Sequence, residues 1–227
     1  MASSGAAVYV PPMAGSDARE GPGRARSVPA AGDDAGVEAN ARLTAALGAV
    51  LLVLLAAEGV TIVEIRPLLT PHVFIGMLLL PAVLVKMATT GYRFARYYIG
   101  APAYRRKGPP PLVLRLFGPF VVASTLVVLA SGIALLVVPE GLRRSILFVH
   151  KASFVLWFGL MTVHVLGHLL DTARLAPRDW VGPWRRQVRR ATLRQWVLVS
   201  TVAAGIPLGL VLLDRVGPWL AGPRPGG

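Results

Sequence analysis

The sequence of 227 residues has no cysteine. Disulfides, thiolate nucleophiles, zinc–thiolate sites and iron–sulfur clusters are therefore excluded within this chain. Acidic residues are also scarce, since 11 Asp and Glu stand against 24 Lys and Arg. Any metal or redox chemistry must consequently rest on the four histidines, with Met, Glu or Lys side chains as helpers.

The resulting formal charge of +13 raises the question of a nucleic-acid partner. The basic residues, however, lie in the connectors between apolar blocks and do not gather on one amphipathic face. This distribution argues against nucleic-acid binding.

Apolar residues are abundant: 54% of the chain is hydrophobic and the mean hydropathy is +0.59. A soluble domain of this length could not hide so much apolar surface. The apolar residues form five blocks, each close to or above the roughly 20 residues that cross a bilayer as a helix. We therefore predict an all-α, polytopic transmembrane helical bundle in the lipid bilayer over 42–213, with spans at about 42–62, 67–90, 112–138, 145–170 and 195–213.

The two ends of the chain lack such blocks. Residues 1–41 are rich in Ala, Gly, Pro and Ser, carry scattered charges of both signs and show no periodicity, which predicts a disordered tail. They also lack the basic start and apolar stretch of a secretory signal peptide. Residues 214–227 are expected to form a short tail after the last span.

Charge in the connectors predicts the orientation of the bundle. Two connectors are strongly basic, and two are short and poor in charge. Because basic loops stay in the cytoplasm, we expect a cytoplasmic N-terminus, an extracytoplasmic C-terminus and a location in the inner (plasma) membrane. The basic residues are Arg93, Arg96, Arg105, Arg106, Lys107 and Arg115 in one connector, and Arg174, Arg178, Arg185, Arg186, Arg189, Arg190 and Arg194 in the other.

All four histidines fall inside predicted spans: His72 in the second, and His150, His164 and His168 in the fourth. An ionisable side chain at membrane depth is costly and is by default functional, facing the bundle interior. At roughly 100° per residue, the three histidines of the fourth span share one stripe of their helix. This helix thus presents imidazoles near both membrane faces.

His72 and His150 are expected to form a pair. Each lies about five residues after the start of a helix that runs inward, so both should lie at similar depth near the outer face. Two imidazoles facing each other across a bundle can serve as the axial ligands of a six-coordinate haem iron. Nearby small residues that leave room for a porphyrin edge, or serve plain helix packing, are Gly76, Ser131 and Gly132.

Other charged residues near the outer end have two interpretations each. Lys151, Arg143 and Arg144 are candidates for contacts with haem propionates or with lipid headgroups. Glu58 is a candidate for proton movement, for orienting a ligand histidine, or for simply reaching the outer interface.

At the inner end of the predicted bundle, the sequence leaves the kind of site open. His164 and His168 are four residues apart, a spacing that can hold one metal ion on one helix face. A second haem there would need a ligand from another helix, and the second span offers Met87 or Lys86 at about the right depth.

The runs TPHVFIGMLLLPAVLVKMATTGYRFARYY and HKASFVLWFGLMTVHVLGHLL resemble the bacterial membrane b-type cytochromes, which include the haem-carrying membrane subunits of formate dehydrogenases and nickel hydrogenases and small stand-alone relatives. The resemblance implies four or five helices around one or two haems b that pass electrons between quinone and an extracytoplasmic redox partner. Carried over, His72 and His150 match an outer axial pair, and His164 (or His168) matches an inner-haem ligand. Two-haem members supply histidines from two helices at both depths, whereas this chain has only His72 outside the fourth span.

We therefore expect a membrane cytochrome b that carries at least one bis-histidine haem in a bundle of four of its helices and acts as an electron-transfer component. No catalytic residue is assigned. The rival hypotheses are a proton-coupled transporter or channel component that uses Glu58, Lys86 and the histidines, a non-redox membrane scaffold, and a divalent-metal carrier that uses His164 and His168.

Overall fold

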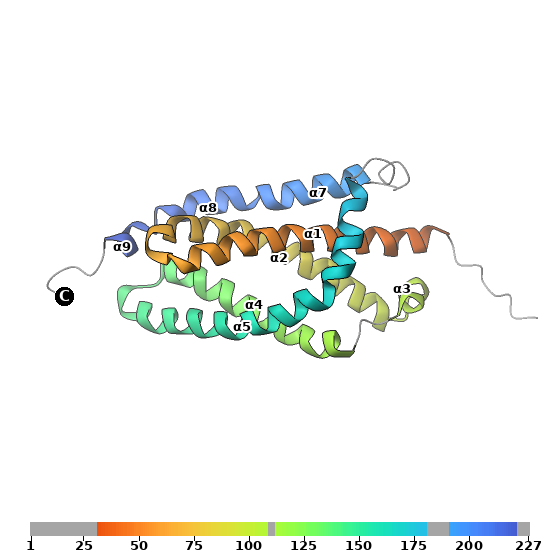
Figure 1. The fold of residues 1–227 in the computed structure, drawn as a ribbon, viewed down its shortest axis with the longest axis horizontal. Coiled ribbons are helices and arrows are strands. Elements are labelled where there is room, and N and C mark those ends of the chain that lie inside the picture. Colours follow the sequence, from red (N-terminus) through yellow and green to blue (C-terminus); the bar gives the residue numbers. More distant parts are fainter. Residues whose placement is uncertain (1–30, 109–111, 181–190, 222–227) are drawn as a thin grey trace, which may run out of the picture.

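The computed structural model describes residues 31–108, 112–180 and 191–221, and every regular element in these ranges is helical (Figure 1). The elements are α1 (Ala31–Val63), α2 (Ile65–Tyr98), α3 (Pro102–Lys107), α4 (Leu112–Val137), α5 (Glu140–Leu175), the 3-10 helix η1 (Ala176–Asp179), α7 (Ala191–Ala203), α8 (Gly205–Leu213) and α9 (Gly217–Leu220).

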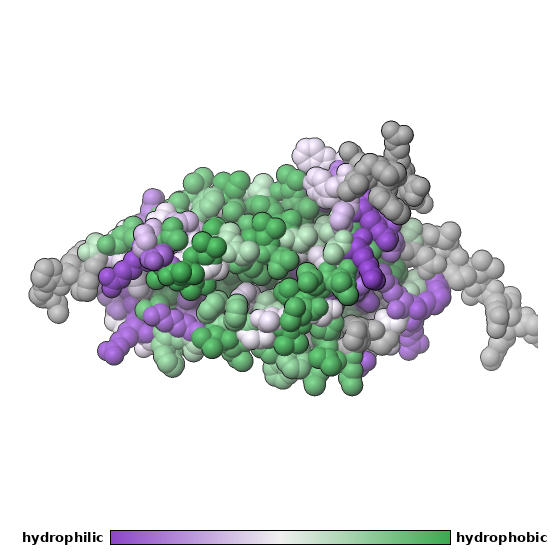
Figure 2. All heavy atoms as spheres, in the orientation of Figure 1, coloured by the Kyte–Doolittle hydropathy of each residue, from purple (hydrophilic) through white to green (hydrophobic). Residues whose placement is uncertain are grey.

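Five of these helical stretches are long and apolar enough to cross a membrane, as the hydropathy pattern predicted. They are Ala35–Val63, Ile65–Tyr98, Leu112–Val137, Glu140–Arg178 and Ala191–Leu213, the last of which joins α7 and α8. The chain is therefore a multi-pass membrane protein by helix length and hydropathy. Figure 2 shows the matching surface, with an apolar band around the middle of the bundle and hydrophilic residues toward both ends.

The long helices run side by side, and three pairs of them make the most extensive contacts. α1 packs on α2, α8 covers α2, and α4 packs on α5. The α1–α2 and α4–α5 turns lie at the same end of the bundle as α9, whereas α3 and the start of α7 lie at the opposite end (Figure 1). The C-terminal part of α5 leaves the bundle direction and crosses α1, which accounts for the contacts of α1 with α5 and η1.

Glycines allow the closest of these approaches. A Cβ atom at Gly205 would lie 2.5 Å from the Cα of Leu78, and one at Gly209 would lie 2.6 Å from the ring of Phe74. Small residues at such positions let two membrane helices approach to backbone contact, where dispersion forces replace the hydrophobic effect that lipid cannot supply. This is how α8 fits against α2.

The first helix starts earlier than the sequence predicted. α1 begins at Ala31 rather than near residue 42, so residues 31–41 of the predicted disordered tail are helical. The reason is tertiary: Val37 is buried in a cluster with Ala101, Ala103 and Tyr104 from the region of α3. Residues 1–30 of the predicted tail lie outside the described residues.

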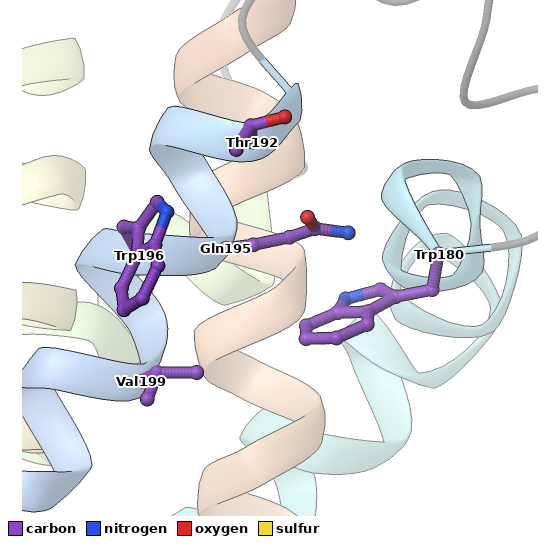
Figure 3. Close-up of a pocket in the computed structure, with 5 residues that line it drawn as sticks. All are labelled: Trp180, Thr192, Gln195, Trp196 and Val199. Carbon is purple, nitrogen blue, oxygen red and sulfur yellow. The ribbon is translucent and has the colours of Figure 1, made fainter.

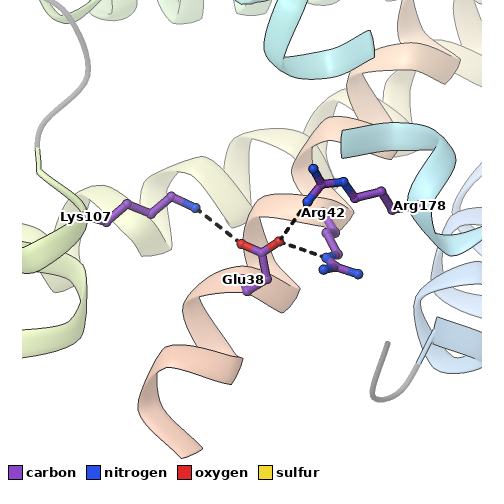
Figure 4. A network of polar contacts seen from close by, with 4 residues as sticks. All are labelled: Glu38, Arg42, Lys107 and Arg178. Atoms are coloured by element: carbon purple, nitrogen blue, oxygen red, sulfur yellow. Dashed lines mark hydrogen bonds and ion pairs between the residues drawn. The ribbon is translucent and has the colours of Figure 1, made fainter. Parts of the chain in front are cut away.

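Glu38 lies at the centre of a polar network at this end of α1 (Figure 4). Its carboxylate accepts a hydrogen bond of 2.9 Å from Nε of Arg42, and its two oxygens lie 3.9 Å from Lys107 Nζ and Arg178 Nη1. The network joins α1 to α3 and to η1. These contacts, which composition alone does not reveal, extend the helix beyond its apolar block.

The other boundaries differ less. α2 continues to Tyr98, and α5 begins at Glu140 and ends at Leu175, several residues beyond the predicted limits of 90, 145 and 170. Helices continue past the hydrocarbon core into the headgroup region, where hydropathy no longer marks them. In the predicted C-terminal tail, α9 forms one further short helix, and residues 222–227 lie outside the described residues.

Candidate functional site

His72 is held by two residues of the neighbouring helix. Its Nδ1 lies 2.8 Å from Thr61 Oγ1 and 3.1 Å from Glu58 Oε1. Thr61 donates its own hydroxyl proton to the backbone carbonyl of Glu58 at 2.6 Å, so its oxygen is left to accept from His72. The Nδ1–H of His72 thus points at two acceptors on α1.

His150 is held in a similar way by α4. Its Nδ1 lies 3.1 Å from the carbonyl oxygen of Val128 and 3.1 Å from Ser131 Oγ. Since a carbonyl oxygen can only accept, the Nδ1 of His150 carries the proton. Ser131 donates to the same carbonyl at 3.1 Å, which again leaves its oxygen free to accept from the ring.

The two imidazoles therefore have the same arrangement. Each uses Nδ1 as a donor toward a neighbouring helix, and neither Nε2 has a hydrogen-bond partner in the part of the chain that the structure describes. His72 and His150 are also close enough to interact electrostatically. α2 and α5, which carry them, are not packed extensively against each other; α2 packs on α1 and α8, and α5 on α4.

This donor set fits a haem iron in two respects. Metal-ligating histidines almost always donate their second ring N–H to a carboxylate or carbonyl, which fixes the tautomer and turns the other nitrogen toward the metal. A small residue also lies against one ring and another beside its carboxylate neighbour: a Cβ at Gly132 would lie 3.2 Å from His150 Cε1, and one at Gly76 would lie 3.6 Å from Glu58 Oε1. In addition, Glu58 Oε2 is buried without a hydrogen-bond partner among the described residues.

At the opposite end of the bundle, His164 and His168 lie one turn apart on α5, with ring centroids 4.8 Å apart and ring planes tilted by 58°. Lys86 of α2 interacts electrostatically with both rings. Its Nζ donates to the backbone carbonyl of Thr44 at 2.6 Å, and it fits beside Gly48, whose Cβ would lie 3.0 Å from Nζ. The cluster of His164, His168 and Lys86 thus lies where three helices, α1, α2 and α5, meet.

His164 and His168 are the two side chains of this cluster that can ligate a metal ion. Within the described ranges, no group of three or more His, Asp or Glu side chains lies close enough to hold a metal ion. His164 and His168 supply two imidazoles, and the third neighbour is the cation of Lys86. An ammonium group repels a bound divalent cation.

The three basic residues considered for propionate contacts have different surroundings. Arg143 lies 3.6 Å from Glu140 and stacks over the ring of Trp219 at 5.2 Å, so it connects the start of α5 to α9. Arg144 and Lys151 are exposed.

The sequence did not predict that Thr61 and the carbonyl of Val128 are hydrogen-bond partners of the histidines. A backbone carbonyl leaves no signal in a sequence, and a threonine in an apolar helix is common.

Two hollows of the surface lie away from all four histidines. One of about 390 Å³ is lined by Trp180, Thr192, Gln195, Trp196 and Val199 (Figure 3). The other, of about 290 Å³, follows α1 along Ala49, Val50, Val53 and Leu54.

Comparisons with known proteins found no matching family model, no similar curated protein and no similar solved structure.

Proposed function

We propose that this protein is a membrane cytochrome b whose haem is held between His72 and His150. The observation that carries the proposal is the matched state of the two rings, each of which donates Nδ1–H to a neighbouring helix while Nε2 remains available. In a membrane interior, such preorganised imidazoles are costly, and ligation of a metal gives both nitrogens of each ring a partner.

The residues have separate tasks in this proposal. The Nε2 atoms of His72 and His150 would be the axial ligands. Thr61 and Glu58 orient the first ring, and the Val128 carbonyl with Ser131 orients the second. A haem b with these ligands supplies a one-electron Fe(III)/Fe(II) couple. Because His72 and His150 would both ligate the iron, the site would favour electron relay over substrate binding.

The electron donor and acceptor belong to the proposal as well. We place the N-terminus and the basic connectors on the cytoplasmic side of the inner (plasma) membrane, following the charge bias of the connectors. The His72–His150 pair would then lie near the outer face, within reach of an extracytoplasmic oxidoreductase. Quinone in the bilayer is the proposed second partner. This assignment of partners rests on the resemblance to membrane b-type cytochromes.

A reduced-minus-oxidised optical spectrum of the purified protein, expressed with haem supplied, tests the proposal. A low-spin b-type signal is expected in the wild type and should be lost in His72→Ala and in His150→Ala. His168→Ala is the matched control, because it removes a histidine of the same helix as His150. An unchanged signal in that control supports one haem, whereas loss of part of the signal points to a second haem at His164 or His168. A wild type without the low-spin signal rules the proposal out.

A proton-coupled transporter is a second candidate, favoured by one observation. Buried ionisable groups lie near both ends of the bundle, Glu58 beside His72 and Lys86 beside the inner histidine pair. Ionisable side chains at two depths are typical of proton relays. Proton flux into liposomes that contain the haem-free protein, abolished by Glu58→Gln or Lys86→Met, would favour this function over electron transfer.

A further inference from the structure

Arg143 differs from the other cations at its end of the bundle because most of its side chain is buried. The side chain is 25% exposed, whereas the other described cations near this end, Arg66, Arg144, Lys151 and Arg215, are all exposed. The Nε atom of Arg143 is buried without a hydrogen-bond partner among the described residues. A buried donor without a partner costs free energy, so this nitrogen needs an acceptor.

Arg143 lies on the same face of α5 as His150. At roughly 100° and 1.5 Å per residue, their spacing of seven residues is about 20° short of two turns and about 10 Å along the helix. By the same count, Arg144 and Lys151 lie about 120° and about 100° away from His150 around the helix. Of the three, Arg143 alone therefore follows His150 toward the nearer end of the bundle.

Trp219 approaches Arg143 from another side of the bundle. The Cζ atom of Arg143 lies 5.2 Å from the centre of the Trp219 ring, which is within the range of a cation–π contact. Trp219 belongs to α9, which follows α8, and α8 covers α2 (Figure 1). The contact thus links the helix that carries His150 to the segment beside the helix that carries His72, at the end of the bundle nearer to both histidines.

One edge of the Arg143 guanidinium has a partner and the other has none. Nη1 lies 3.6 Å from Oε1 of Glu140, whose side chain is 78% exposed, so this ion pair is weak. Nε and Nη2 have no hydrogen-bond or ion-pair partner in the part of the chain that the structure describes. Two neighbouring N–H groups of this kind match a carboxylate, which accepts two parallel hydrogen bonds from arginine.

Haem b supplies such a carboxylate, because two propionates extend from one edge of its ring. An ionised carboxylate at membrane depth is costly. A haem between His72 and His150 would therefore be most stable with its propionate edge toward the nearer membrane face. Arg143 lies on that side of His150.

We propose that Arg143 binds a haem propionate through Nε and Nη2, and that Trp219 is a positioning residue that holds the Arg143 guanidinium. This role rests on the haem function proposed above. It extends the site from the two helices that supply the axial ligands to α9, which contributes no ligand to the iron.

The test compares two iron porphyrins that differ only in the charge of their side chains. The haem-free full chain in detergent is titrated with iron protoporphyrin IX and, separately, with its dimethyl ester, whose propionates are neutral. Arg143→Gln should weaken binding of the first about tenfold or more, because a hydrogen bond to a charged group contributes that much. Binding of the ester should equal that of the wild type, which also shows that the variant is folded. Arg66→Gln, an exposed cation near the same end, is the matched control and should bind both as the wild type does.

Trp219 is tested by two substitutions. Trp219→Ala should weaken binding of iron protoporphyrin IX by about two- to fivefold through loss of the cation–π contact, and Trp219→Phe should restore most of it. Neither change should affect the ester.

The failures can be told apart. If the wild type binds neither porphyrin, the haem function and the role of Arg143 are both wrong. If the wild type binds both, the role of Arg143 alone is overturned by unchanged affinity in Arg143→Gln, by an equal loss of both porphyrins in that variant, or by an equal loss of iron protoporphyrin IX in Arg66→Gln.

Discussion

Glu58 Oε1 on α1 lies 3.1 Å from Nδ1 of His72 on α2, and both side chains are largely withdrawn from the surface, at 15% and 20% exposure. Its second oxygen, Oε2, is buried with no hydrogen-bond partner in the described residues. Among the described residues, no carboxylate pairs with His150; its Nδ1 faces the carbonyl of Val128 and the hydroxyl of Ser131. The two imidazoles are therefore electronically different.

Replacing Glu58 by Gln should raise the midpoint potential of the proposed haem while leaving the haem bound. An amide oxygen still accepts from His72 but is a weaker acceptor than a carboxylate, so the ligand becomes less basic and ferric iron is less favoured. A tenfold change in that preference equals about 59 mV for a one-electron couple. Redox titration followed optically measures the change. Glu64→Gln, an exposed position in the α1–α2 turn, should leave the potential unaltered; an equal potential in Glu58→Gln would show that this carboxylate does not tune the ligand.

Replacing Gly132 by Val should displace the His150 ring and reduce haem content. A Cβ at this position would lie 3.2 Å from Cε1 of the ring, and the added methyl groups would crowd it further. Loss of correct ligand orientation typically costs about 10- to 100-fold in metal affinity. Haem content per protein is the measurement. Gly118→Val is a matched change in the same helix, where a Cβ meets nothing within 4 Å, and haem content equal to that of this control would contradict the role of Gly132.

Replacing Gly205 by Ala should destabilise the protein by roughly 1–3 kcal/mol, the usual cost of overpacking. The new Cβ would lie 2.5 Å from the Cα of Leu78 and 2.8 Å from the carbonyl oxygen of Met77, and backbone atoms cannot rotate away. Gly59→Ala is the control, because its Cβ meets nothing within 4 Å and alanine favours the helix by about 0.5–1 kcal/mol. Thermal unfolding in detergent compares them, and the idea fails if both variants melt alike.

Replacing Glu38 by Gln should loosen the first turns of α1 without affecting the histidine sites. The carboxylate is 41% exposed and pairs with Arg42, Lys107 and Arg178, so its net effect should stay below about 1 kcal/mol. Hydrogen exchange of the amides of residues 35–42 should become faster, as it should in wild-type protein at high salt. Glu140→Gln, which removes the partner of Arg143 at the other end of the bundle, should leave these amides unaffected.

Much of the architecture could be predicted from the sequence. Four of the five apolar blocks lie within helical spans of the structure, and the block at 112–138 passes the end of its span by one residue. The agreement arises because backbone groups in lipid must satisfy their hydrogen bonds within the segment, which makes an apolar stretch of about 20 residues helical. The helical state of residues 31–41 could not be predicted, since it depends on Val37 packing beside Tyr104 and on Glu38 meeting cations from α3 and η1.

The candidate site, too, could be predicted from the sequence only in part. Periodicity and depth were enough to nominate His72 and His150, because spacing along a helix is a local property. Whether the pair binds haem stays a prediction. The partners that orient the rings, Glu58 with Thr61 and Val128 with Ser131, come from other helices.

The sequence by itself determined that this chain spans a membrane with five apolar helices and that its four histidines lie within them. Only the tertiary structure decided which helices meet, that Lys86 lies beside His164 and His168, and that His72 and His150 each donate through Nδ1 to a neighbouring helix. The physical reason is that hydropathy is a property of each segment by itself. Hydrogen bonds between helices depend instead on how the helices are rotated and spaced, and packing contacts such as Gly205 against Leu78 set both.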